Sequence, residues 1–231
     1  TASDGSYTLS SSQASVSIVA LTDDTTIDSS SGSVLTGVTL RAPSGASVIS
    51  PNTTLMKEAG LTAAEVSEVL GLSADIDITT FNPYAAGVNA ADALAVEKVS
   101  QQIMSTISTF AAATEGSGAS AADAFSTALA SVVEVVQQKS VAFQSDSTVK
   151  LDFSSSTDLA SIQNNVTTKA ATVSGVDQTA LATMANDTAT AIKNVNDKID
   201  TVSDLTSDAS KNVFSTTQVL SEQVETAAKT E

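Results

Sequence analysis

Two groups of closely spaced carboxylates are the residues of this chain best suited to chemistry. Asp23, Asp24 and Asp28 form one group, and Asp75 and Asp77 form the other. Calcium takes about six to eight oxygen ligands, so both groups are weak candidates for a calcium site. Neither spacing reproduces the Asp-x-Asp-x-Asp-Gly loop, and carboxylates that form turns and face solvent are the alternative that we weigh more heavily. We therefore expect no cofactor, with calcium as the one exception worth testing.

The residue types that the chain lacks remove most catalytic chemistry. The sequence contains no Cys and no His, which excludes thiolate and imidazole nucleophiles and the usual zinc ligand sets. No Gly-x-Ser-x-Gly elbow is present, and no histidine could activate a serine. We predict no catalytic residue and expect that the protein is not an enzyme.

Charge and composition narrow the possible partners. The net charge of −16 disfavours nucleic acid, whose binding depends on Lys and Arg. No run approaches the roughly 20 apolar residues of a membrane span. A hydrophobic fraction of 42% that is almost entirely aliphatic predicts a real core, and the remaining polar residues are mainly Ser, Thr, Asn and Gln. This pattern fits an exported protein, and the first residue, Thr1, suggests either a removed leader or a piece of a longer chain.

Residues 1–50 predict a thin β-rich region. Val16 and Ile18 alternate with serines, and Val34, Val38 and Leu40 fall on one side of a second alternating run. A few short strands bury little surface, so this region must pack on helices or on another chain.

Residues 51–153 predict a compact helical domain. A short helix should end at Gly60, and Thr62 with Glu65 forms a capping box for a helix that ends near residue 71. A helix over 90–114 and another that starts at Ser120 predict an antiparallel hairpin. The apolar positions 149, 151 and 153 suggest a strand that returns to the N-terminal sheet.

Residues 154–231 predict long helices near 157–172, 177–202 and 205–229. Apolar residues at alternating three- and four-residue spacing form a seam that includes Ile192, Val195, Ile199 and Val202. The seam could close a bundle within one chain or join two subunits. The predicted fold class is α+β, with a small N-terminal β-region (a partial sandwich) followed by a mainly helical bundle with long C-terminal helices.

Three segments together resemble a module of very large exported bacterial adhesins of the RTX and cadherin-like types. They are residues 2–9 (ASDGSYTL), residues 37–55 with Ala-Pro and Pro-x-Thr-Thr-Leu, and residues 70–83 with Leu-Gly-Leu and Asn-Pro. The resemblance covers about residues 1–140, and it departs from the pattern at Asn52 and Asn82, where Leu and Asp are more usual. It implies an extracellular, non-enzymatic role in adhesion or in a matrix.

The leading hypothesis is a subunit of a cell-surface filament, surface layer or adhesive matrix. If the strand through Tyr7 and Leu9 closes a sandwich, its earlier partners are missing, and a neighbouring copy could supply a strand to the exposed edge. The alternative, to which we give equal weight, is that the earlier strands of the sandwich lie outside this chain. The expected partners are other copies of the chain and possible surface components, with contacts through Tyr7, Leu9, Val16 and Ile18 and through the seam. The second hypothesis is a monomeric adhesion or ligand-binding module of a larger exported protein.

Overall fold

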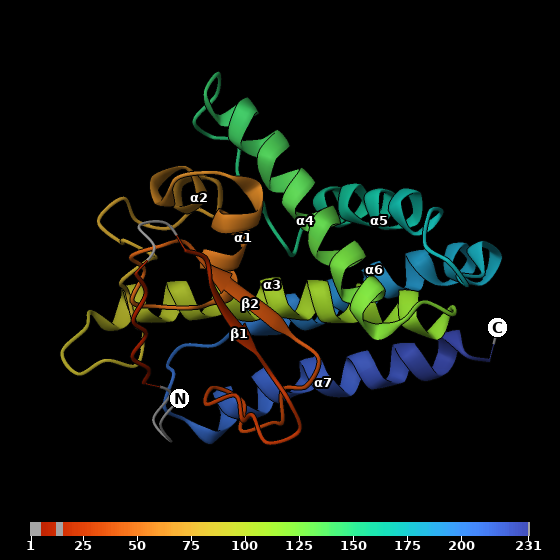
Figure 1. The fold of residues 1–231 in the computed structure, drawn as a ribbon, viewed down its shortest axis with the longest axis horizontal. Coiled ribbons are helices and arrows are strands. Elements are labelled where there is room, and N and C mark those ends of the chain that lie inside the picture. The colour runs from red at the N-terminus through yellow and green to blue at the C-terminus, as the bar shows by residue number, and fades with distance from the viewer. Residues whose placement is uncertain (1–5, 13–15, 231) are drawn as a thin grey trace.

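A computed structural model describes residues 6–12 and 16–230 of the chain. Within these ranges the protein is mainly helical, with seven helices and a small two-stranded antiparallel sheet (Figure 1). The prediction of a helical fold with a small β part is confirmed, whereas the described residues form no sandwich. The elements are β1 (Ile18–Leu21), β2 (Thr39–Ala42), α1 (Pro51–Ala59), α2 (Ala63–Val69), α3 (Ala90–Gly116), α4 (Ala121–Phe143), α5 (Ser156–Ala170), α6 (Gln178–Asp200) and α7 (Asp208–Ala228).

The sheet consists of β1 and β2, joined by a hairpin over residues 26–35. Ile18 lies opposite Ala42, and Leu21 lies opposite Thr39. Within the hairpin, Ile27 and Val34 form an isolated bridge. The strand predicted through Tyr7 and Leu9 is wrong, because described residues 6–12 form no strand. The other residues of the predicted segment, 1–5, lie outside the described ranges.

Helix α1 closes one edge of this sheet with two threonine hydroxyls. The Arg41 amide donates to Thr54 Oγ1 over 2.9 Å, and the Arg41 carbonyl oxygen accepts from Thr53 Oγ1 over 3.1 Å. These groups would otherwise be the unpaired edge of β2. Thr53 also completes a capping box with Ser50 at the start of α1.

The helix ends predicted from sequence are confirmed in the first half of the bundle. Gly60 ends α1 in the left-handed conformation, with φ of 68°. Thr62 and Glu65 form a capping box at the start of α2. Ser120 accepts a hydrogen bond from the Asp123 amide at the start of α4.

Helix α3 is the centre of the bundle. Helix α7 runs parallel to it: Leu94 packs near Phe214, whereas Gly116 at the far end approaches Ala228. Helix α6 runs antiparallel to α3, since Lys98, near the start of α3, donates to the carbonyl oxygen of Asp200 at the end of α6. The largest core cluster includes residues on both sides of the predicted boundary after residue 153, from Leu55 to Ile192.

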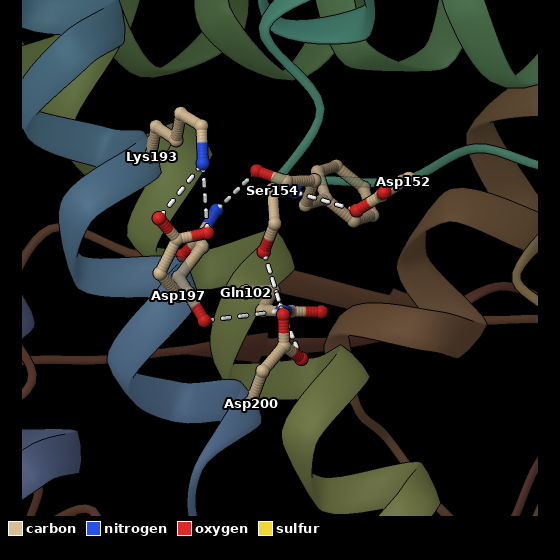
Figure 2. Close-up of polar contacts among 8 residues, drawn as sticks. Gln102, Asp152, Ser154, Lys193, Asp197 and Asp200 are labelled. Carbon is tan, nitrogen blue, oxygen red and sulfur yellow. Dashed lines mark hydrogen bonds and ion pairs between the residues drawn. The ribbon is translucent and has the colours of Figure 1, made fainter.

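A polar network ties α3 to α6 and to the loop before α5 (Figure 2). Gln102 is buried and donates to Asp200 Oδ1 over 2.9 Å and to Ser154 Oγ over 3.3 Å. Ser154 in turn donates to Asp200 Oδ2 over 2.8 Å. Because a buried amide without partners is costly, these bonds fix how α3 and α6 lie against each other.

The segment around Val149, Leu151 and Phe153 is not a strand, which corrects the prediction, and Phe153 lies in a turn. The Leu151 amide donates to the Val69 carbonyl oxygen over 2.9 Å. Leu151 and Phe153 are buried in the main core cluster. The alternating apolar positions therefore reflect burial in the helical core and not pairing with a sheet.

Candidate functional site

The outer edge of β1 is the open side of the sheet. The Thr22 amide donates to the Val38 carbonyl oxygen, so the antiparallel alternation makes Ala20 and Leu40 a hydrogen-bonded pair and turns the backbone groups of Val19 and Leu21 away from β2. Among the described residues, no further strand pairs with this side of β1. It is the geometry of a strand that can accept a partner.

Exposed apolar side chains gather in the same part of the chain. Leu21 is 75% exposed and Val19 is 43% exposed, although both belong to a strand. Of the exposed large hydrophobic residues that the structure describes, most belong to the N-terminal β-region: Leu9, Val19, Leu21, Ile27 and Val34. Single exposed apolar residues are ordinary, but a group beside an open strand edge is typical of an interaction surface.

The predicted strand-side contact residues lie in or near this region. Leu9 is exposed, whereas Val16 and Ile18 are half-buried. The half-buried Tyr7 donates its hydroxyl to the Ala46 carbonyl oxygen over 3.4 Å, which ties residues 6–12 to the loop before α1. Of the four predicted contact residues, Leu9 is the most available for contact.

The prediction that the seam of α6 joins subunits needs a correction, because the seam faces the interior of the chain. Ile192, Val195 and Ile199 are buried, as is Val202 just beyond the helix. Val195, Ile199 and Val202 pack with Phe214 of α7 in one cluster, and Ile192 belongs to the main core. The intramolecular alternative describes the seam, and its side chains cannot join subunits while the bundle stays closed.

The calcium candidates lie in two separate turns. Asp23 accepts hydrogen bonds from Thr25 and Thr26, and Asp77 accepts two from Thr79. These bonds lower the pKa of both carboxyls, the Thr25 and Thr79 hydroxyls having the largest effect. Asp24 and Asp75 are exposed. In residues 6–12 and 16–230 no three carboxylates come together to hold a metal ion, so the calcium site stays a prediction.

A polar cluster, which the sequence did not predict, joins the hairpin of residues 26–35 to α3, and its members Ser30, Glu97 and Gln101 are buried. Gln101 Nε2 donates to Ser30 Oγ over 2.6 Å and to Glu97 Oε1 over 2.8 Å. Ser30 donates to both carboxylate oxygens of Asp28, over 2.8 and 2.7 Å. We call Asp28, Ser30, Tyr84, Glu97 and Gln101 the Glu97 cluster.

Electrostatics make Glu97 the unusual member of this cluster. Its side chain is buried, and burial, with a further contribution from the nearby Asp28 carboxylate, raises its pKa. Burial and the charge of Glu97 also raise the pKa of the Tyr84 hydroxyl. No basic group contributes to the shift of Glu97. The one signal in the sequence is that Glu97 and Gln101 stand four residues apart on the same side of a helix.

Comparisons with family models, with curated proteins and with solved structures found no match for this chain. Within the ranges that the structure describes, none of the helices has the length and apolar character that crossing a membrane requires. The open edge of β1 and the Glu97 cluster are therefore interpreted from their geometry.

Proposed function

We propose that this chain is a non-catalytic structural module of an extracellular bacterial assembly, and that it joins a neighbouring copy by strand addition to β1. The observation that carries the proposal is the open outer edge of β1, beside which Val19 and Leu21 are exposed. In strand addition, backbone hydrogen bonds supply affinity and alternate side chains supply specificity.

The two edges of the sheet differ in a way that supports this proposal. The edge of β2 is occupied by the hydroxyls of Thr53 and Thr54. The edge of β1 carries no comparable cover among the described residues, and no proline or charged residue lies within the strand. Proteins usually protect exposed edges with such residues, so an unprotected edge favours pairing.

The extracellular, non-enzymatic part of the proposal rests on composition and on the resemblance to exported adhesins. The chain lacks Cys and His and has a net charge of −16. A strongly acidic surface keeps such a protein soluble and disfavours nucleic acid. A monomeric adhesion module of a larger exported protein is the second candidate, and the exposed residues Leu9 and Ile27 would then belong to its recognition surface.

Leu21→Lys tests the proposal at the edge itself. Leu21 is 75% exposed, so the lysine is expected to leave the fold intact while it places a charge beside the incoming strand. Sedimentation velocity over a range of protein concentrations should show larger species for the unmodified chain and monomers for Leu21→Lys.

The matched control is Val141→Lys, because Val141 on α4 is 74% exposed and lies far from the sheet in the sequence. This variant should associate as the unmodified chain does. A chain that stays monomeric at every concentration, or association that Leu21→Lys leaves unchanged, would contradict strand addition.

A further inference from the structure

A groove of about 950 Å³ lies beneath the sheet, between the β-region and helices α3 and α7. In Figure 1 the strands lie in front of these two helices. Val96 and Met104 of α3, Phe81 of the preceding loop and Phe214 of α7 supply apolar surface to the groove. A concave site of this size with mixed apolar and polar walls is typical of small-ligand sites.

The charged residues that line the groove are all acidic. They are Asp28, Glu97, Glu222 and Glu225, and none of the described lining residues is Lys or Arg. The Glu97 carboxylate is buried, and all the neighbouring groups that affect its charge are neutral or acidic. A buried carboxylate is usually paired with a cation, because an isolated buried charge is costly. The described lining residues therefore supply no positive group to pair with Glu97.

Two buried polar atoms in the same lining have no hydrogen-bond partner. Asn52 is fully buried, its Nδ2 donates to Ser100 Oγ over 2.9 Å, and its Oδ1 is unpartnered. Thr217 Oγ1 of α7 is also unpartnered. Ser100 follows Glu97 by three residues on α3, so Asn52 meets this helix within one turn of Glu97. Both unpaired oxygens can accept a hydrogen bond, as the carboxylate can.

We infer that this groove binds a primary alkylammonium group, the chemistry of a lysine side chain. A buried carboxylate and an unpartnered amide oxygen suit an ammonium, which has three donors and no acceptor. The apolar surface from Val96, Met104 and Phe214 suits the alkyl stem.

The geometry favours an ammonium over two other cations. An ionised carboxylate has about four acceptor positions. Gln101 already donates to Glu97 Oε1, so the two carboxylate oxygens are not equally free, which favours a compact ammonium over a guanidinium that needs both oxygens for its paired donors. A divalent metal needs several oxygen ligands, and the described residues bring no three carboxylates together.

Binding should strengthen as the pH rises, since the ammonium pairs with the ionised form of Glu97. Burial raises the pKa of Glu97, so protons compete with the ligand to a higher pH than at an ordinary glutamate. The titratable groups around it are Asp28 of the hairpin and Tyr84 of the loop before α3, and Glu222 and Glu225 of α7 line the same groove. The three carboxylates add to the attraction, whereas the Tyr84 hydroxyl, whose pKa is raised, adds no charge.

Nuclear magnetic resonance titration tests the inference on the whole chain. The probe is n-butylammonium chloride at constant ionic strength, and the reporter is the side-chain amide of Gln101, which bonds Glu97. We expect a saturable shift of this signal, and apparent affinity that is weakened about tenfold or more in Glu97→Gln. The control Asp187→Asn removes one exposed carboxylate on α6 and should bind as the unmodified chain does.

Three further measurements make the result decisive. The uncharged probe 1-butanol should give no saturable shift, and Asn52→Leu should weaken n-butylammonium binding while Glu97 is kept. N-acetyl-lysine-methylamide identifies the source: binding at least as tight as that of n-butylammonium assigns a lysine of a partner chain, and weaker binding assigns a free amine.

A shift that does not saturate, equal responses to both butyl probes, or unchanged affinity in Glu97→Gln would overturn the inference. The site lies within one chain and does not depend on strand addition. Repeating the titration in Leu21→Lys therefore separates a failure of the ammonium site from a failure of self-association.

Discussion

The backbones of Gly118 and Gly175 are in direct contact: a Cβ atom added to Gly118 would lie 2.3 Å from the Gly175 carbonyl oxygen. Next to this contact, the Asp177 amide donates to the Ser117 carbonyl oxygen over 2.7 Å. The turn between α3 and α4 therefore rests on the turn between α5 and α6 without room for a side chain. It fixes the two helical hairpins relative to each other at this end of the bundle.

Gly118→Ala should destabilise the protein by about 3 kcal/mol or more, as measured by urea denaturation. The alanine would meet backbone atoms that cannot rotate away, and it would have to adopt a φ of 112°. The matched control is Gly87→Ala, where φ is 82° and no atom lies within 4 Å of the added Cβ. The control should cost about 1–2 kcal/mol from backbone strain alone. Equal losses in the two variants would show that the contact contributes nothing.

Ile199→Asp should unfold the chain and not merely separate subunits. Ile199 is fully buried between α6 and α7, and an unpaired carboxylate there has no partner to offset its desolvation. Val219→Asp is the control, because Val219 on α7 is 51% exposed and should change the stability by about 0.5 kcal/mol or less. Circular dichroism and light scattering distinguish the outcomes. If the unmodified chain forms larger species and Ile199→Asp forms folded monomers, the seam joins subunits, contrary to this prediction.

Gln102→Met should lower the free energy of unfolding by about 1–2 kcal/mol. The methionine keeps the apolar stem of the side chain but removes the donor that bonds Asp200 and Ser154. The same change at Gln138, which is exposed on α4, should have an effect near zero. Thermal or urea unfolding compares the two. A loss at Gln138 as large as that at Gln102 would assign the effect to the methionine itself.

Glu97→Gln should become more stable relative to the unmodified chain as the pH rises. The pKa of Glu97 is raised in the folded state from an ordinary value of 4.5, so the folded chain binds this proton more tightly than the unfolded chain does. The contribution of Glu97 to the free energy of unfolding therefore falls as the pH rises from 4.5 through the folded pKa, and glutamine abolishes this contribution.

Urea denaturation at several pH values between about 4 and 8 spans this window. Glu65→Gln is the opposite control: hydrogen bonds from the Thr62 amide and hydroxyl lower the pKa of Glu65. The stability that Glu65 contributes is present above its ordinary pKa of 4.5 and is lost as the pH falls through the folded value. Parallel pH curves for Glu97→Gln and the unmodified chain would contradict the prediction for Glu97.

Local signals in the sequence were sufficient to predict the helices and their ends. Gly60, Thr62 with Glu65, and Ser120 act on backbone groups within a few residues, so their effect does not depend on the rest of the fold. The long helices followed from apolar spacing for the same reason. The ends of α5, α6 and α7 agree with the predicted ends to within a few residues.

Features that depend on distant partners could not be predicted in this way. Apolar spacing shows that Ile192 and Ile199 are buried, but it does not say whether the cover comes from the same chain. Alternation at Leu151 and Phe153 has the period of a strand, yet their cover is the helical core. The Glu97 cluster needs Ser30, which is distant in sequence from Gln101 and meets it only in the folded chain.

The two threonines of α1 give the proposed assembly a direction. Since Thr53 and Thr54 occupy the backbone groups of Arg41, a new strand can be accepted on the β1 side alone. Each copy can therefore receive one strand through this sheet and no more. If the donated strand is a segment other than β1, the product is an unbranched line with two unlike ends. A short peptide that pairs with β1 but offers no sheet of its own would stop elongation at one end and leave the opposite end unaffected.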